Sequence, residues 1–322
     1  MKKFLFLLFG ALIFASCGTE TDTESKITYL PDDSGLATES PAASSGSIEN
    51  EPLDTNFGGC GAEEQPEAII SLSPTATEML YAVGAGPQVA AVDNYSYWPP
   101  EAPVIEDLSG FNPNVEAIAD LEPDLVVLSD SGIQEELELL GIQVLVAEAA
   151  TELEDVYDQM LQIGEFTCQR RGASEAVQRM RASMSALVEA ASERGEGLTY
   201  FHELDDTLYS VTSSTFIGQI YSMTGLQNIA DPADEDGSSW GYPQLNQEFI
   251  LDADPDIIFF ADAQCCGQTV ATISERPGWS ELTAVRNQHV FEMDADIASR
   301  WGPRLVQFLE TVLSALETVT GR

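Results

Sequence analysis

Two segments of this chain repeat each other closely enough to predict a two-lobed fold. Residues 114–130, NVEAIADLEPDLVVLSD, align without a gap to residues 246–262, NQEFILDADPDIIFFAD, and seven paired positions are identical. Each copy predicts a short helix with Asn as its N-cap, then a Pro-Asp turn, then a buried strand. Continuous apolar strands such as LVVL and IIFF are typical of parallel sheets covered by helices on both faces. The repeat therefore predicts two α/β lobes of related design, with a ligand cleft between them.

One acidic residue occupies the same place in both copies. Glu116 and Glu248 fall in the first turn of the two predicted helices. A carboxylate is favoured there by the unpaired N–H groups and the helix macrodipole, so helix capping alone would account for both residues. The other interpretation is that Glu116 and Glu248 share a functional role.

The charge of the chain limits its partners. The 322 residues include 13 basic and 54 acidic side chains, which gives a net charge of −41. Nucleic acid and an anionic membrane surface are therefore disfavoured as partners. No Lys or Arg occurs between Lys26 and Arg170, so the first lobe has no fixed cation. A bound anion would need backbone N–H groups there, or Arg276, Arg300 and Arg304 of the second lobe.

The amino terminus predicts export. Lys2 and Lys3 precede an apolar run at residues 4–14 that is short and terminal, so residues 1–16 are expected to be a signal peptide. The run ends in Phe-Ala-Ser-Cys, which resembles a bacterial lipobox. Cys17 is then the predicted lipidation site, and it would anchor the protein to the outer face of the cytoplasmic membrane. Simple secretion with an unmodified Cys17 is the alternative.

The rest of the chain divides by composition and predicted elements. Residues 17–66 are rich in Ser, Thr, Pro, Gly and acidic residues, and they are expected to be a disordered tether. An N-terminal lobe is predicted at residues 67–150, a helical connector at 151–196 and a C-terminal lobe at 197–322. The second half of the connector is long enough to link the lobes rigidly. The C-terminal lobe is expected to begin with two strands, the second of them at residues 207–211.

An aromatic loop follows the second predicted strand of the first lobe. Residues 93–100 read DNYSYWPP and place Tyr95, Tyr97 and Trp98 on one short segment. Loops after strands carry the ligand sites of open α/β sheets, and amphipathic rings suit such sites. We interpret this loop as a binding surface. Packing of the three rings onto their own lobe is the alternative.

Catalytic and metal-binding motifs are weak in this sequence. Residues 237–241 match the G-x-S-x-G motif of serine hydrolases, with Ser239 as the nucleophile. That motif needs a strand before it and a helix after it, whereas an acidic loop and a Tyr-Pro pair flank it here. His202 and His289 are the two possible bases, and two histidines are few for a zinc or manganese receptor. We expect no catalytic site, metal or cofactor, and an exported serine hydrolase is the remote alternative.

The cysteines predict disulfide bonds. If Cys17 carries lipid, four cysteines of an exported protein remain to pair, namely Cys60, Cys168, Cys265 and Cys266. Three connectivities are possible, and a bond between the adjacent Cys265 and Cys266 would be strained. The expectation is that Cys168 pairs with one of these two and Cys60 with the other. Free buried thiols are the alternative.

Five segments of the chain together carry a family resemblance: IISLSPTATEMLYAVGAG at 69–86, DNYSYWPP at 93–100, NPNVEAIADLEPDLVV at 112–127, YPQLNQEFILDADPDIIF at 242–259 and SRWGPRLV at 299–306. Through them, residues 67–318 resemble the class III periplasmic solute-binding proteins, which serve ABC importers of cobalamin, haem and ferric siderophores. The resemblance implies two Rossmann-like lobes joined by one long rigid helix, with little hinge closure. It also implies that one exposed Glu on each lobe docks against arginines of a permease dimer, and Glu116 and Glu248 are the matching positions.

Among the ligands of that family, the resemblance favours cobalamin or a related corrinoid. The loop DNYSYWPP is similar to the aromatic loop of cobalamin-binding members, and Tyr242 falls where they place an aromatic ring in the cleft. A corrin ring needs little fixed charge, whereas anionic siderophores and haem usually need cations. A ferric-siderophore or haem receptor is the alternative, because Arg300 could supply one cation. The expected ligand contacts are Tyr95, Trp98, Trp240, Tyr242 and Trp301, with Arg300 for polar orientation; Tyr97 and His202 rank behind them.

Overall fold

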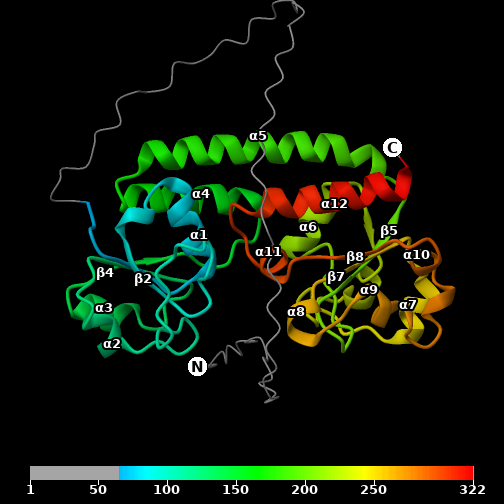
Figure 1. Cartoon of the computed structure of the whole chain (residues 1–322), viewed down its shortest axis with the longest axis horizontal. Helices are drawn as coiled ribbons and strands as arrows, with labels where there is room; N and C mark the ends of the chain where they lie inside the picture. Colours follow the sequence, from blue (N-terminus) through cyan, green and yellow to red (C-terminus); the bar gives the residue numbers. More distant parts are fainter. Residues whose placement is uncertain (1–64, 322) are drawn as a thin grey trace, which may run out of the picture. The chain divides into compact units, whose positions relative to one another are not determined.

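The computed structural model describes residues 65–321, which form two four-stranded sheets with helices on both faces (Figure 1). The strand order is β2-β1-β3-β4 in the first sheet and β6-β5-β7-β8 in the second, and all pairings are parallel. The two sheets thus share one topology, as the repeat predicts. The strands are β1 (Ile69–Ser71), β2 (Val89–Val92), β3 (Leu125–Leu128), β4 (Gln143–Val146), β5 (Thr199–Glu203), β6 (Gln227–Asn228), β7 (Ile257–Phe260) and β8 (Val290–Glu292).

We call the first sheet with its helices the N-terminal lobe and the second the C-terminal lobe. The helices are α1 (Pro74–Val83), α2 (Val115–Ala119), α3 (Gln134–Leu139), α4 (Leu153–Phe166), α5 (Arg170–Gly195), α6 (Phe216–Ser222), α7 (Gln247–Ala253), α8 (Ala263–Cys266), α9 (Val270–Ser274), α10 (Thr283–Arg286), α11 (Ala295–Ser299) and α12 (Leu305–Thr320). Three 3-10 helices are η1 (Gly86–Gln88), η2 (Asp231–Asp234) and η3 (Trp279–Glu281). The expected signal peptide, Cys17, Cys60 and nearly all of the expected tether lie outside the described residues.

Both sheets are buried on both faces, which explains their continuous apolar strands. In β1, Ile69 packs into the core shared with α1, α4 and α5, while Ile70 packs into a separate core with α2 and α3. In β7 the same alternation sends Phe259 toward α12 and Ile258 toward Trp279 and α7. The first of these cores runs through both lobes without a break. The prediction of an α/β protein with two related lobes is confirmed.

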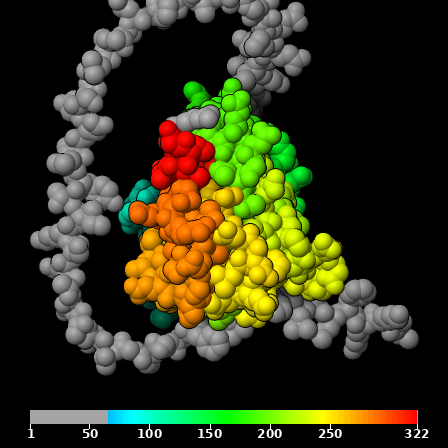
Figure 2. Space-filling view, turned by 90° about the vertical axis from the view of Figure 1, so that its right-hand side faces the viewer, coloured from blue at the N-terminus to red at the C-terminus, as the bar shows by residue number. Residues whose placement is uncertain are grey.

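Helix α5 joins the two lobes. Its 26 residues span about 39 Å, and it packs against α1 and α4 of the N-terminal lobe and α12 of the C-terminal lobe (Figure 1). Figure 2 shows the red surface of α12 beside the green surface of α5. A Cβ atom at Gly172 would collide with the carbonyl oxygen of Val83, and one at Gly195 would collide with that of Thr224. Glycine near each end of α5 therefore lets its backbone sit directly on both lobes. This is the long rigid helix that the resemblance implies.

The repeated residues fill equivalent structural positions. Asn114 and Asn246 are the N-caps of α2 and α7, and their side chains accept hydrogen bonds from backbone N–H groups of the first turn. The Oδ2 atom of Asp124 accepts from the backbone N–H of Ala68 (3.0 Å), just before β1. In the second copy, Asp256 Oδ2 accepts from the N–H of Thr199 (2.9 Å), the first residue of β5. Each repeat thus ties its own turn to the neighbouring strand.

The strand predicted at residues 207–211 does not form. Only Tyr209 makes a β-bridge there, with Gln244, among the described residues. Asp205 accepts hydrogen bonds from the backbone N–H and the hydroxyl of Thr207, and Leu208 has a φ of 69°. This local turn interrupts the extended backbone that a strand requires.

The disulfide pairing expected for the second lobe is wrong. Cys265 and Cys266 of α8 are bonded to each other, whereas each was expected to pair with a distant cysteine. Cys168 is disulfide-bonded as well. It lies between α4 and α5, next to Thr167, whose carbonyl accepts a hydrogen bond from Gln88 of the N-terminal lobe. Cys168 and α8 therefore belong to different lobes.

None of the helices within residues 65–321 is both long enough and apolar enough to cross a membrane. In the same residues, no group of three or more His, Cys, Asp or Glu side chains is arranged to hold a metal ion.

Candidate functional site

A buried ion network joins the lobes next to the aromatic loop. Glu78 of α1 is 4% exposed and accepts hydrogen bonds from Arg300 (2.8 Å) and Arg304 (2.6 and 3.0 Å) of the C-terminal lobe. Arg300 also donates to Asp296 (2.8 Å) and to the backbone carbonyl of Tyr95 (3.3 Å). Charge-assisted bonds of this kind are strong when the donors and acceptors are removed from water. The network therefore fixes the aromatic loop against both lobes.

Two rings of the aromatic loop contact the same arginines. The guanidinium of Arg300 lies 5.3 Å from the centre of the Tyr97 ring, and that of Arg304 lies 5.1 Å from the centre of the Trp98 ring. The Tyr97 hydroxyl donates to Asp296, and burial together with this hydrogen bond raises the pKa of Tyr97. The Trp98–Pro99 peptide bond is cis. All three aromatic residues of the loop remain more than a third exposed. The rings of Tyr97 and Trp98 are thus held by the arginines and are still accessible.

Sequence reasoning missed one aromatic residue of this surface. Phe111 is 71% exposed and packs edge-on against Tyr95, with 5.2 Å between the ring centres. It lies in the loop before α2, which the repeat did not include. A single Phe among polar residues produces no periodic hydrophobic pattern, so the sequence does not single it out. The exposure of Phe111 in the structure is the observation that identifies it as part of this surface. Tyr95, Tyr97, Trp98 and Phe111 together form what we call the aromatic patch of the N-terminal lobe.

The other expected ligand contacts lie on the C-terminal lobe. Trp240 is 86% exposed and Tyr242 is about half exposed, on the loop between η2 and α7. Asp234 stabilises this loop by accepting hydrogen bonds from the N–H groups of Ser239 (2.7 Å) and Gly241 (2.7 Å). Trp301 is half-buried and packs against the shared core. Within residues 65–321, no hydrogen bond or ring contact links Trp240 or Tyr242 to the aromatic patch.

Arg300, the expected polar contact for the ligand, is already bonded to protein groups. Its side chain is 9% exposed, and its donors are shared among Glu78, Asp296 and the Tyr95 carbonyl. A ligand acceptor would have to compete with these groups. The structure thus brings Tyr95, Trp98 and Arg300 together, and the role of Arg300 toward a ligand stays a prediction.

Glu116 and Glu248 are exposed on the two repeated helices. Asn114 Oδ1 accepts from the N–H groups of Glu116 (3.0 Å) and Ala117 (3.3 Å), and Asn246 Oδ1 accepts from Phe249 N–H (2.9 Å). The asparagines therefore provide the side-chain caps of these helices. Neither glutamate forms an ion pair with any residue in the described part of the chain. The macrodipole still favours a carboxylate in the first turn of each helix, and the docking role of the two glutamates stays a prediction.

The serine motif lacks the geometry of a hydrolase. Ser239 lies in a turn, with neither a strand before it nor a helix after it. His202 is fully buried, its Nδ1 lies 3.0 Å from the Tyr221 hydroxyl, and burial lowers its pKa to about 4. His289 Nδ1 lies 3.2 Å from the backbone carbonyl of Asp256. Neither histidine is hydrogen-bonded to Ser239, so no base activates it.

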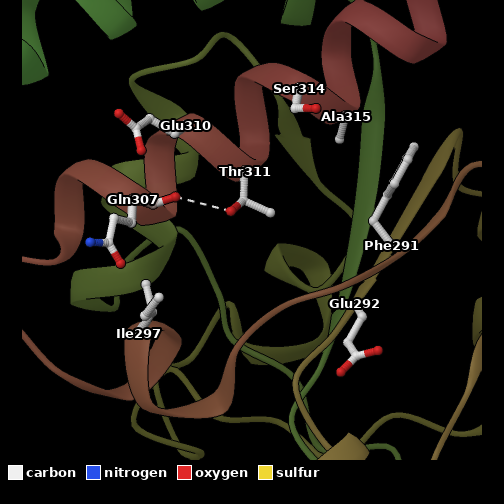
Figure 3. Close-up of a pocket in the computed structure, with 8 residues that line it drawn as sticks. All are labelled: Phe291, Glu292, Ile297, Gln307, Glu310, Thr311, Ser314 and Ala315. Atoms are coloured by element: carbon white, nitrogen blue, oxygen red, sulfur yellow. Dashed lines mark hydrogen bonds between the residues drawn. The ribbon is translucent and has the colours of Figure 1, made fainter. Parts of the chain in front are cut away.

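Two cavities lie in the C-terminal lobe. One of about 470 Å³ opens between β8 and α12 (Figure 3). Its lining includes the carboxylates Glu292 and Glu310, and it contains none of the expected ligand contacts. A second, of about 210 Å³, lies at the carboxyl ends of β7 and β8, next to α8 and α11. That is the edge at which open α/β sheets bind ligands. The second cavity is lined by Ala261, Ala263, Gln264, Glu292, Met293, Asp294 and Ala295.

Comparison with known proteins identifies a family and several relatives. The profile of the family described as periplasmic binding protein matches residues 69–297. An uncharacterised ABC transporter substrate-binding lipoprotein of Bacillus subtilis is 30% identical over 264 residues, which is 79% of this chain and 81% of the relative. A vitamin B12-binding protein of Vibrio parahaemolyticus is 27% identical over 80% of this chain and 92% of its own length. These matched proteins are binding proteins, which confirms the prediction that the chain is not an enzyme.

Solved structures agree with this assignment. The periplasmic vitamin B12-binding protein of Vibrio cholerae matches with a TM-score of 0.63 and 26% identity over 80% of this chain and 99% of that one. A periplasmic haem-binding protein of Roseiflexus matches with a TM-score of 0.67 over 79% and 98% of the two chains, at 19% identity. The second match shows the shared fold alone.

Proposed function

Because this chain belongs to the periplasmic binding protein family, we propose that it is the solute-binding receptor of an ABC importer, and that it captures cobalamin or a related corrinoid. The receptor would hold its ligand between the lobes and deliver it to a permease dimer. The aromatic patch carries this proposal, since it offers large apolar ring faces for a flat, extended ligand.

The charges around the aromatic patch support a ligand with little negative charge. Arg300 and Arg304 are the two cations that contact the patch in the described residues, and Glu78 and Asp296 accept hydrogen bonds from them. An anionic ligand would have to displace these carboxylates. A corrin ring with amide side chains can instead lie against the rings without disturbing the ion network. Vitamin B12-binding proteins among the relatives agree with this choice.

A ferric-siderophore or haem receptor is the second candidate. The observation that favours it is the presence of two arginines beside exposed aromatic rings, because guanidinium groups recognise carboxylates in bidentate geometry. Such a ligand would require Arg300 or Arg304 to leave Glu78. The corrinoid proposal requires no such rearrangement, and we prefer it for that reason.

Docking to the permease is assigned to Glu116 and Glu248. They occupy the same position on α2 and α7, both are exposed, and the N-caps of their helices are provided by Asn114 and Asn246. One such carboxylate on each lobe is complementary to a two-fold symmetric partner with an arginine on each subunit. Lipid on Cys17 would hold the receptor at the outer face of the cytoplasmic membrane, within diffusional reach of that partner.

Isothermal titration of the purified protein with cyanocobalamin, a ferric hydroxamate and haemin tests the ligand assignment. We expect saturable binding of cyanocobalamin at one site per chain. Binding of the ferric hydroxamate or haemin without cyanocobalamin would replace the corrinoid assignment by the second candidate. An absence of binding to all three compounds would contradict both.

A further inference from the structure

Two carboxyl groups lie buried at the ends of the central strands of the C-terminal lobe. Glu203 is the last residue of β5, and Asp262 follows β7 by two residues; β5 and β7 are neighbours in the sheet. Both residues are 0% exposed. Burial disfavours the ionised form of a carboxyl group, and two adjacent carboxylates repel each other. A cation or a proton is therefore needed to keep them together.

Among the described residues, Arg276 is the cation beside this pair, and it is bonded to Glu203. Arg276 donates to both oxygens of Glu203 at 2.6 Å, and a further donor reaches Gln268 Oε1 at 3.2 Å. The guanidinium also lies 4.6 Å from the centre of the Trp279 ring. Neither carboxyl oxygen of Asp262 accepts a hydrogen bond from any described donor. An ionised Asp262 would thus be a buried carboxylate without a partner.

We propose that Asp262 and Glu203 share one proton, and that this proton holds α8 on the edge of the C-terminal sheet until rising pH removes it. In the protonated state, Asp262 donates a hydrogen bond to the Glu203 carboxylate, which Arg276 neutralises from its other side. The cluster then has no net charge. Removal of the proton leaves two buried carboxylates and one arginine.

The surroundings of Asp262 agree with a protonated carboxyl group. Burial is the largest cause that raises the pKa of Asp262, and the charge of Glu203 and a hydrogen bond to it raise this pKa further, to about 7. The charge of Arg276 lowers the pKa by a smaller amount. The charged groups that face the cluster are Glu203 from β5, Arg276 from the segment after α9, and Asp206, which acts on Arg276 from the loop after β5. His202 of β5 bonds to Tyr221 of α6 in the core shared with α12, and so takes no part.

Both ends of α8 are connected to this cluster. Asp262 is the N-cap residue of α8, and its carbonyl accepts from the N–H of Cys266 (3.1 Å). Gln268, which follows α8 by two residues, accepts from Arg276. Between these two points lies the exposed Cys265–Cys266 disulfide. The residues on either side of Asp262, Ala261 and Ala263, line the 210 Å³ cavity at the ligand-binding edge of the sheet.

The direction of the pH effect follows from these contacts. Below about pH 7 the proton is present and α8 is held; above it the protonated fraction falls about tenfold per pH unit. Repulsion between Asp262 and Glu203 then acts on the segment that Asp262 anchors. If the chain binds its ligand between the lobes, a consequence that rests on the proposed function, affinity also falls as pH rises through 7.

Hydrogen exchange of the purified full-length protein without ligand tests the proposal. Protection of the Cys266 and Gly267 amides, corrected for intrinsic exchange, is measured from about pH 5.5 to about pH 8.5. In the wild type we expect protection to be constant below pH 7 and to fall up to about tenfold per pH unit above it. Asp262→Asn should keep protection at every pH, because its amide N–H can replace the proton, whereas Asp262→Ala should lower protection at every pH.

The repeat provides a matched control. Asp130 is the residue equivalent to Asp262 in the first copy; it is exposed and accepts from the N–H of Gly132 (2.7 Å). Asp130→Asn should leave the pH dependence of α8 unchanged. Constant protection across the pH range in the wild type, or an unchanged pH dependence in Asp262→Asn, would overturn the proposal.

A second measurement uses the wild type alone, so that the proposal can still be tested if the Asp262 variants fail to fold. The infrared band of a protonated carboxylic acid in the wild type should persist above pH 6 and lose its intensity as pH rises through about 7, and its absence at pH 6 would overturn the proposal. Titration with cyanocobalamin at both ends of the pH range is carried out separately. A lack of binding at every pH would count against the proposed ligand and not against the shared proton, which is measured without ligand.

Discussion

Glu78 and Arg300 form an ion pair of 2.8 Å between the two lobes, although 222 residues separate them in the sequence. Both side chains are almost fully buried, and Arg304 adds a second guanidinium to the same carboxylate. Arg300 also donates to the Tyr95 carbonyl. The position of the aromatic loop and the orientation of the lobes therefore depend on the same few bonds.

Substitution of Glu78 is expected to destabilise the protein strongly. Glu78→Ala leaves two largely buried guanidiniums without their shared acceptor, and breaking a buried pair in this way costs about 3–5 kcal/mol in the free energy of unfolding. Chemical denaturation measures this loss. As a control, Glu175→Ala removes an exposed pair with Arg171 on α5, and should leave the free energy of unfolding nearly unchanged. Equal effects of the two substitutions would contradict a joining role for Glu78.

The aromatic patch is expected to supply much of the ligand affinity. Tyr95→Ala removes an exposed ring but keeps the backbone carbonyl that Arg300 contacts, and Phe111→Ala removes its edge-on neighbour. Each substitution should weaken cyanocobalamin binding roughly ten- to a hundredfold in titration calorimetry. Leu139→Ala is the control, because Leu139 is an exposed apolar residue on α3, remote in sequence from the patch. Unchanged affinity in both aromatic variants would place the ligand elsewhere.

The two-lobed architecture could be predicted from the sequence because the repeated segments specify equivalent elements in both lobes. Asn114 and Asn246 cap equivalent helices, Asp124 and Asp256 tie equivalent turns, and the two sheets share one strand order. Local patterns of this kind specify local structure. The missing strand at residues 207–211 is the exception, because a turn built on Asp205 overrides its apolar pattern.

The site was less predictable, because its contacts join residues that no local pattern connects. Glu78 looks like an ordinary helix residue until the fold brings Arg300 and Arg304 to it. Asp130 and Asp262 are the same residue at the same position of the two repeat copies. Asp262 is nevertheless fully buried beside Glu203, whereas Asp130 is exposed. Burial of this kind arises from tertiary packing, which the repeat itself does not reveal.

Docking to the permease is expected to depend on the two repeated glutamates together. Glu116→Ala combined with Glu248→Ala should abolish uptake in cells while leaving the affinity of the purified protein for cyanocobalamin unchanged, since both residues are exposed and unpaired within the described chain. Transport assays and calorimetry measure the two quantities. Glu189→Ala with Glu317→Ala, two exposed glutamates on α5 and α12, is the matched control. Loss of affinity in the first double variant would refute a pure docking role.

His202 is expected to make the protein less stable in acid. Burial lowers its pKa from 6.5 to about 4, so below pH 6.5 the unfolded chain binds a proton that the folded chain does not. The free energy of unfolding should therefore fall by about 3 kcal/mol between pH 6.5 and pH 4 from this residue alone. Asp262 acts in the opposite sense over this range, because its folded pKa is raised. His202→Gln keeps a polar partner for Tyr221 but cannot be protonated, so denaturation curves of this variant should lose the His202 contribution. A pH dependence identical to that of the wild type would show that His202 is not buried in its neutral form.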